Sequence, residues 1–162
     1  MNQLAEINIA RMLAPLDDPL MAGFVEQLDT INALADASPG FVWRFQSAEG
    51  NATAIRPYGD PSILVNLSVW ESREALTAFA YASAHRPVMG RRRQWFARFD
   101  GPYTALWWIP WGHIPSIEEA RERLEHLRLH GPTPISFSFK CPFPAPHGAP
   151  VSVARLVECA TL

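Results

Sequence analysis

The chain has 162 residues, a formal net charge of −2, 48% hydrophobic residues and 19% charged residues. This length is typical of one domain with a sizeable core. Because the charge is near neutral and Arg91–Arg93 is the one basic cluster, we expect neither nucleic acid nor an anionic membrane as a partner.

The cellular setting is predicted from what the sequence lacks. No stretch is long and apolar enough to span a membrane, and the first residues lack the pattern of a signal peptide. Cys141 and Cys159 have no metal-ligand spacing and are too few for a disulfide framework. We therefore expect a cytoplasmic protein without a protein-ligated metal site.

The first half of the chain reads as strand, helix and strand. Residues 4–12 alternate in hydrophobicity as a strand does. Asp18 and Pro19 suit the N-cap and first position of a helix, which Ser38 to Gly40 would end. Residues 41–46 are predicted to form the second strand.

The third predicted strand, residues 63–70, has one apolar face and one mixed face. The mixed face carries Asn66 and Ser68. Polar side chains are awkward in a dry core, so this face suits a wet cavity, a subunit interface or solvent.

Two helices should follow the third strand. Ser72 starts the first, and Pro87 opens the second, whose stripe contains Arg92 and continues to Phe99. Residues 103–109 are predicted to form the fourth strand. Ser116 and Glu119 then form a capping box for a last helix that ends before Gly131.

A proline-rich stretch, residues 132–150, cannot form a central strand. We therefore expect a domain over residues 1–131. Residues 132–162 would form a C-terminal arm packed on the body or on a partner subunit.

The order of elements is that of the ferredoxin-like fold. We predict an α+β protein with a β-α-β-β-α-β antiparallel sheet and extra helices. If the helices cover one face of the sheet, a second copy of the chain could cover the other. We thus predict a homodimer that forms a dimeric α/β barrel.

Most of the chain resembles a bacterial family of unknown function. The resemblance is carried by NIARMLAPLDDPLMAGFV, INALADASPGFVWRF, ILVNLSVWES, SAHRPVMGRRRQWF and the run from LWWIP to HGPTP. That family looks like a branch of the dimeric α/β-barrel superfamily, which includes the antibiotic-biosynthesis monooxygenases. The resemblance implies the fold and a dimer, and it brings no established activity.

A more distant resemblance concerns haem. VWESREALTAFAYASAH is similar to a segment of the haem-degrading monooxygenases of the same superfamily. It implies that Asn8 matches their first-strand asparagine and that His85 lies near their haem-ligating histidine. Phe79 stands where those enzymes have a tryptophan, which departs from the haem-degrading pattern.

Each candidate residue also has a structural interpretation. His85 could ligate haem or act as a general acid or base, or it could cap a helix C-terminus. Arg92 could clamp a carboxylate such as a propionate, or form an ion pair with Glu6 or Glu26.

The large aromatic residues and the remaining histidines likewise have both a functional and a structural interpretation. Trp95 and Phe96 could floor a pocket or fill the core, and Trp107 and Trp108 point to opposite faces of one strand. His126 and His130 have a spacing that can bind zinc, but no third ligand is evident.

The leading functional hypothesis is a small-molecule enzyme of monooxygenase-like type. An aromatic or polycyclic ligand, or a haem, would lie between the sheet and the region from His85 to Trp95. Its catalytic residues would be His85, Arg92 and Asn8. The ligand-binding side chains would be His85, Phe79, Trp95, Phe96 and Trp108. The alternative is a non-catalytic ligand-binding or haem-carrier dimer.

Overall fold

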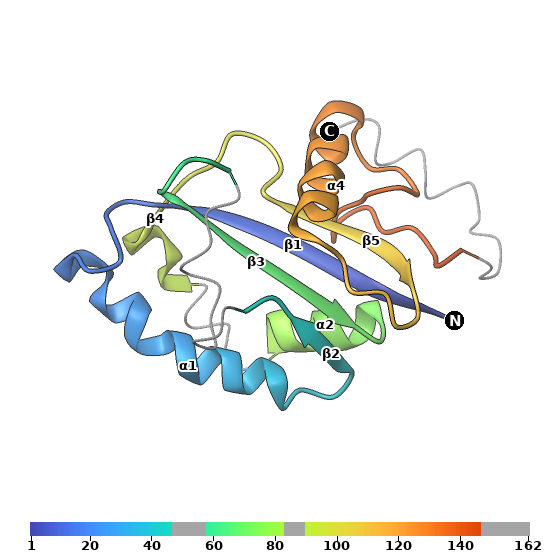
Figure 1. Cartoon of the computed structure of the whole chain (residues 1–162), viewed down its shortest axis with the longest axis horizontal. Helices are drawn as coiled ribbons and strands as arrows, with labels where there is room; N and C mark the ends of the chain where they lie inside the picture. Colours follow the sequence, from blue (N-terminus) through green and yellow to red (C-terminus); the bar gives the residue numbers. More distant parts are fainter. Residues whose placement is uncertain (47–57, 83–89, 147–162) are drawn as a thin grey trace.

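The computed structural model describes residues 1–46, 58–82 and 90–146 (Figure 1). Its centre is a five-stranded antiparallel sheet with the order β2-β3-β1-β4, in which β5 also pairs with β1. The strands are β1 (Asn2–Met12), β2 (Phe41–Arg44), β3 (Ile63–Trp70), β4 (Phe96–Ala97) and β5 (Thr104–Pro110). The helices are η1 (Pro19–Met21), α1 (Ala22–Asp36), α2 (Arg73–Ala82), η2 (Arg92–Gln94) and α4 (Ile117–His130). The predicted α+β class and ferredoxin-like antiparallel sheet are confirmed.

The predicted helix starts have the expected local chemistry. The Asp18 side chain accepts a hydrogen bond from the Leu20 backbone N–H at 2.8 Å, with Pro19 at the first helical position. The Ser116 hydroxyl likewise accepts the Glu119 backbone N–H at 3.1 Å. These side chains satisfy backbone N–H groups that a helix start leaves without internal partners. The predicted capping box is present only in its Ser116 half, because the Glu119 carboxylate binds the Trp107 indole and His113 instead.

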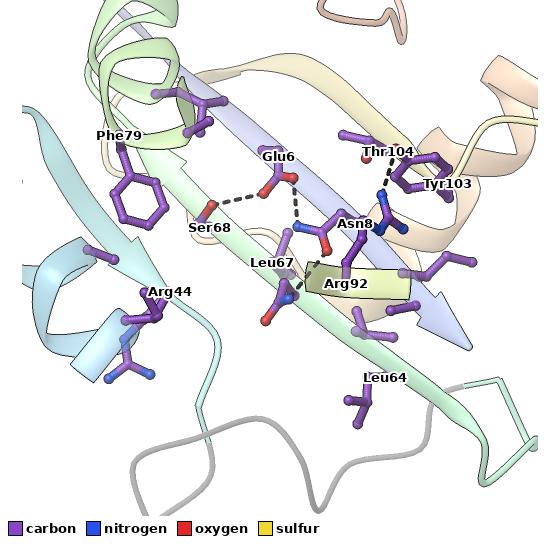
Figure 2. A pocket seen from close by; sticks show the side chains of 18 of the residues that line it. Glu6, Asn8, Arg44, Leu64, Leu67, Ser68, Phe79, Arg92, Tyr103 and Thr104 are labelled. Atoms are coloured by element: carbon purple, nitrogen blue, oxygen red, sulfur yellow. Dashed lines mark hydrogen bonds between the residues drawn. The ribbon is translucent and has the colours of Figure 1, made fainter. Parts of the chain in front are cut away.

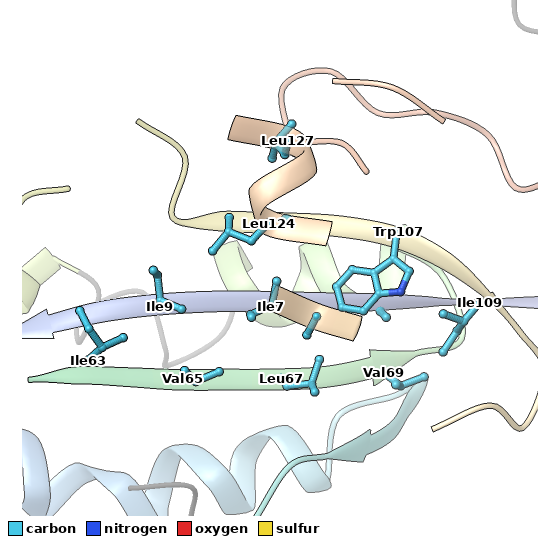
Figure 3. Close-up of a cluster of buried hydrophobic side chains, with 13 residues drawn as sticks. Ile7, Ile9, Ile63, Val65, Leu67, Val69, Trp107, Ile109, Leu124 and Leu127 are labelled. Carbon is cyan, nitrogen blue, oxygen red and sulfur yellow. The ribbon is translucent and has the colours of Figure 1, made fainter. Parts of the chain in front are cut away.

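The two faces of the sheet carry different helices. α1 and α2 pack on one face, through two clusters that include Trp70, Leu76 and Trp95. α4 packs on the opposite face, where Leu124 and Leu127 cover the apolar side chains of β1, β3 and β5 (Figure 3). We expected a second copy of the chain on this face, but α4 covers it from within the same chain.

The helix predicted to run to Phe99 is wrong at its end. Arg92–Gln94 form a short 3-10 helix, after which Phe96 and Ala97 pair with Met12 and Arg11 of β1. β5 pairs with β1 only over Asn2–Asn8, so the last residues of β1 need another partner on that side. Because buried backbone groups require hydrogen bonds, this need outweighs the helical pattern.

The segment after α4 packs along β5. The backbones of Phe137 and Leu106 exchange hydrogen bonds of 2.8 and 2.9 Å, and the Phe137 side chain is fully buried. The Trp108 indole donates to the Phe143 carbonyl at 2.8 Å, and the Ser136 hydroxyl donates to the Arg123 carbonyl at 2.7 Å. Residues 132–146 therefore share the core of the sheet domain.

Within the described residues, no helix has the length and apolar character that crossing a membrane would require.

Phe137→Ala should test how strongly this segment is held. Truncating a buried phenylalanine leaves a cavity, so we expect a loss of about 3–5 kcal/mol in the free energy of unfolding. Urea denaturation would measure it. Ile135→Ala, at a side chain that is 49% exposed, is the matched control and should cost far less. Equal losses in the two variants would show that the segment is not anchored by Phe137.

Candidate functional site

A cavity of about 690 Å³ lies between the sheet and the elements on its α1–α2 face (Figure 2). Its floor is the mixed face of β1 and β3, and α1, α2 and the stretch from Arg92 to Phe96 contribute the walls. Residues of β2, the stretch from Pro102 to Thr104 and the stretch from Ser138 to Lys140 also contribute to the described lining. The mixed face predicted from residues 63–70 is therefore a cavity floor.

A chain of polar side chains crosses this floor. Glu6 accepts hydrogen bonds from Asn8 Nδ2 at 2.9 Å and from Ser68 Oγ at 3.1 Å. The Trp70 indole donates to Ser68 at 3.0 Å, and Asn66 Nδ2 donates to Asn8 at 3.3 Å. Figure 2 shows the bonds that link Ser68, Glu6 and Asn8 across the two strands.

The strand register brings these residues together. In the antiparallel pair β1–β3, Glu6 lies opposite Ser68 and Asn8 lies opposite Asn66. Alternate residues of a strand point to the same face, so both pairs and Trp70 face the cavity. The neighbouring Ile7 and Leu67 point to the dry face under α4.

The direction of the hydrogen bonds follows from Trp70. An indole N–H can only donate, so the Ser68 oxygen accepts from it and the Ser68 hydroxyl hydrogen is directed to Glu6. On the other side, Asn66 donates to Asn8 and Asn8 donates to Glu6. Donors therefore converge on the Glu6 carboxylate from both ends of the network.

Burial raises the pKa of the Glu6 carboxyl from its ordinary 4.5 to about 7, and the bonds from Asn8 and Ser68 oppose that rise. The Glu6 side chain is almost entirely removed from water, with 7% of its surface exposed. Desolvation disfavours the charged form, whereas donated hydrogen bonds favour it. Both protonation states of Glu6 are therefore accessible near neutral pH.

A second polar group lies at the η2 side of the cavity. Arg92 Nη1 donates to the Tyr103 hydroxyl at 2.8 Å, and the guanidinium carbon is 4.5 Å from the centre of the Tyr103 ring. The sequence led us to consider Glu6 or Glu26 as its partner, and the structure places it on a tyrosine. Within the part of the chain that the structure describes, no carboxylate forms an ion pair with Arg92, so its positive charge suits an acidic ligand.

Aromatic rings form the apolar walls. Phe79 stacks on Trp70 with ring centres 5.1 Å apart, and Phe41 meets the same indole edge-on at 5.3 Å. Near η2, the ring of Phe24 contacts those of Trp95 and Phe96. These walls can accept the flat faces of an aromatic ligand.

Most of the candidate residues within the described part meet at this cavity. Its lining includes Asn8, Phe79, Arg92, Trp95 and Phe96. Trp108 lies elsewhere, because its indole bonds to Phe143 and packs on Phe137 beneath the C-terminal segment. His85 lies outside the described residues.

Sequence reasoning missed Glu6 as a cavity residue and considered it only as a partner of Arg92; it also missed Tyr103, which binds Arg92. A signal was present, because alternation along residues 4–12 places Glu6 on the same face as Asn8. A carboxyl inside an apolar strand is uncommon and indicates either a buried pair or a functional group.

The other histidines within the described residues, His113, His126 and His130, belong to the α4 side of the molecule. His113 contacts Glu119 at 2.7 Å, and the same carboxyl group accepts the Trp107 indole at 2.9 Å. His126 contacts Thr133 at 2.9 Å, and burial and the nearby His130 lower its pKa. Across the described residues, no cluster of three or more His, Cys, Asp or Glu side chains could hold a metal ion.

The described lining does not fit a haem. It contains no histidine or cysteine that could ligate iron, and Asn8 is held by Glu6 and Asn66. A buried carboxyl in the floor would also face the macrocycle. Haem binding therefore stays a prediction that depends on His85.

The fold and the cavity together define an α+β protein with a ferredoxin-like sheet and a cavity that is partly lined by aromatic side chains. The chain belongs to DUF3291, a family described as a domain of unknown function, whose model matches residues 3–153. No curated protein matches it.

The solved structures that are similar in shape include the following three. One is SnoaB, a cofactor-independent oxygenase from Streptomyces nogalater. It is 14% identical in sequence, the match covers 72% of this chain and 98% of that chain, and the TM-score is 0.47. Another is NE2512, a protein of unknown function from Nitrosomonas europaea. It is 13% identical, the match covers 72% of this chain and 97% of that chain, and the TM-score is 0.45. The third, from Chloroflexus aurantiacus J-10-fl, is named as a proposed antibiotic biosynthesis monooxygenase. It is 18% identical, the match covers 70% of this chain and 97% of that chain, and the TM-score is 0.40.

Replacing Glu6 by Gln should change stability in a pH-dependent way. The folded carboxyl keeps its proton up to about pH 7, whereas the ordinary pKa is 4.5, so the folded state binds more protons between these values. Stability from this group is complete below pH 4.5 and falls as pH rises towards 7. The total loss by pH 8 is about 3 kcal/mol.

The stability of Glu6→Gln relative to the wild type should therefore rise by up to about 3 kcal/mol between pH 4 and pH 8. A loss that is independent of pH is added to this change, because one of the two donors to Glu6 would face an amide NH2 group that cannot accept. Urea denaturation at both pH values would measure the difference. Glu122→Gln, at an exposed position of α4, is the matched control. A Glu6→Gln difference that is the same at pH 4 and pH 8 would contradict a raised pKa.

Proposed function

We propose that this protein is a small-molecule enzyme of monooxygenase-like type that acts on an aromatic or polycyclic ligand. The observation that carries the proposal is the cavity of about 690 Å³, which combines aromatic walls with two separate polar groups. A concave, largely apolar site with a few convergent polar side chains is the usual form of a small-molecule site. Phe79, Trp95 and Phe96 hold the flat rings of the ligand.

Arg92 anchors an acidic group of the ligand. Its guanidinium has five N–H donors, and the bond to Tyr103 uses one of them. Carboxylates and phenolates match this planar fork, and charge-assisted hydrogen bonds are stronger than neutral ones. Arg92 is the first residue of η2 and lies in the wall of the cavity, whereas Glu6 lies in its floor, so a rigid ligand can contact both.

The reaction that we propose is oxygenation of an activated methylene group. The superfamily that the sequence resembles includes monooxygenases, and the cavity offers groups that bind a substrate and move a proton. The substrate supplies the electrons: its carbanion adds O2, and loss of water leaves a ketone, so CH2 and O2 become C=O and H2O. The protein positions the substrate and handles the protons.

The test uses anthrone, a tricyclic ketone with an acidic methylene group. Anthrone and O2 give anthraquinone and one water, so oxygen uptake and quinone absorbance should rise together in proportion to protein concentration. Binding of anthrone without any turnover would favour the alternative, a non-catalytic binding protein. Tryptophan fluorescence would measure the binding of anthrone, and the absence of binding would overturn the proposal.

Arg92→Gln should weaken the binding of acidic ligands selectively. We expect the Kd of anthracene-9-carboxylate to rise about tenfold, because one charge-assisted hydrogen bond is lost. Fluorescence titration would measure it, and the neutral 9-(hydroxymethyl)anthracene should bind equally well to both proteins. Arg93→Gln, at the exposed neighbouring position, is the matched control. A similar loss for both ligands would show that Arg92 supports the shape of the cavity rather than the charge.

Two further expectations remain proposals. A haem ligated by His85 would give a sharp Soret band that His85→Ala abolishes, and absorption spectra before and after adding haem would show it.

We also propose a homodimer, as the resemblance implies. Since α4 already covers the opposite sheet face, a dimer would need to use another surface or an α4-containing interface. A monomeric mass at micromolar concentration would contradict it.

A further inference from the structure

We propose that Glu6 is the proton acceptor of this cavity, and that its substrates are molecules with an acidic hydrogen on a carbonyl-activated carbon or a phenol. This inference rests on the proposed function and adds the residue that starts the chemistry. It assigns to Glu6 a role that neither His85 nor Arg92 needs to fill.

The position of Glu6 suits a base. It lies on β1 in the floor of the cavity, and β1 is hydrogen-bonded to β3 on one side and to β5 on the other. Asn8 holds one carboxylate oxygen and Ser68 holds the other, which fixes the orientation of the group. Because the base is already held in one geometry, the reaction does not lose conformational entropy in reaching that geometry.

The hydrogen bonds leave room for a proton. A carboxylate has about four acceptor positions, and Asn8 and Ser68 occupy two of them. Trp70 and Asn66 set the directions of these bonds, so the network presents only donors to Glu6. The network therefore uses neither of the two acceptor positions that remain on the carboxylate. A substrate C–H or O–H can approach the remaining positions.

The charged groups around Glu6 come from several elements. Among the described lining residues Glu6 is the single carboxyl, and the basic groups are Arg44 of β2, Arg92 of η2 and Lys140 of the C-terminal segment. Arg44 forms an ion pair with Asp36 at 2.8 Å, and Arg92 bonds to Tyr103. The titratable hydroxyls of the lining are those of Tyr81 and Tyr103.

The state of Glu6 near neutrality supports the assignment. Burial brings the pKa of its carboxyl to about 7, which is far more basic than an exposed glutamate. A general base is most effective when its pKa lies near the working pH, since it is then both ionised and basic enough to accept a proton. Arg92 and Tyr103 can meanwhile stabilise the negative charge that appears on the substrate oxygen.

The step balances without an oxidant or a cofactor. The substrate C–H bond breaks, its proton forms an O–H bond with the Glu6 carboxylate, and the electron pair stays in the substrate as an enolate. The reverse step returns the proton to carbon. In the absence of O2 this cycle exchanges the substrate hydrogen with solvent and leaves no other product.

That exchange is the test. Anthrone is incubated with the protein in D2O under argon, and proton NMR follows the loss of its methylene signal. We expect the wild type to accelerate exchange over buffer, and Glu6→Gln to lower the protein-catalysed rate by about 100-fold, as removal of a general base does. Anthrone binding, measured by tryptophan fluorescence, should change less than twofold. Glu122→Gln should exchange at the wild-type rate.

The pH profile gives a second, independent readout. Exchange by the wild type should rise with pH as the Glu6 carboxyl ionises. Asn8→Ala removes the stronger of the two bonds that hold the pKa of Glu6 down, so the midpoint should move to higher pH. If Glu6→Gln does not fold, this shift decides the matter, because a merely structural role for Asn8 would leave the midpoint unchanged.

The outcomes separate the two proposals. If wild type and Glu6→Gln both bind anthrone and exchange it equally, or the wild type binds without accelerating exchange, Glu6 is not the base and the binding site stands. If exchange depends on Glu6 but O2 yields no anthraquinone, the inference holds and the oxygenase function fails. If the wild type does not bind anthrone, the proposed function is overturned and this inference falls with it.

Discussion

The antiparallel pairing of β1 with β3 is the constraint on which the rest of the structure depends. In this register Ile7 lies opposite Leu67, and Glu6 lies opposite Ser68. Because alternate side chains point to opposite faces, the first pair enters the dry core and the second enters the cavity. A slip by one residue would bury the polar set under α4 and expose the apolar set, so the core that forms with α4 also determines where the polar network can be.

The two faces also balance energetically. The α4 face is made of fully buried apolar side chains, among them Trp107 and Leu124 (Figure 3). Their burial stabilises the fold through the hydrophobic effect. The cavity face works against stability, because it holds a carboxyl away from water and surrounds a void. Sites that are costly to fold are often functional, and the strong core on the other side makes such a site tolerable.

Local patterns predicted the elements well where a short-range signal existed. The strand over residues 63–70 and the Ser116 cap agree with the structure because alternation and capping depend on neighbouring residues. The short strand at Phe96–Ala97 and the position of α4 depend on what distant parts of the chain leave unpaired or uncovered. Asn8, Arg92 and the aromatic walls could be named from composition and resemblance. The network around Glu6 required the register of two strands, which no single segment reveals.

The pairing of Phe137 with Leu106 has a consequence for the behaviour of the protein in a crowded solution. β5 is an outer strand rich in large apolar side chains, and an open outer strand offers its backbone to any other chain that can extend beside it. The Phe137 backbone occupies part of that edge, and the prolines that follow Phe137 lack the N–H groups that further strand addition would need. The C-terminal segment thereby covers part of the edge at which another chain could otherwise add a strand.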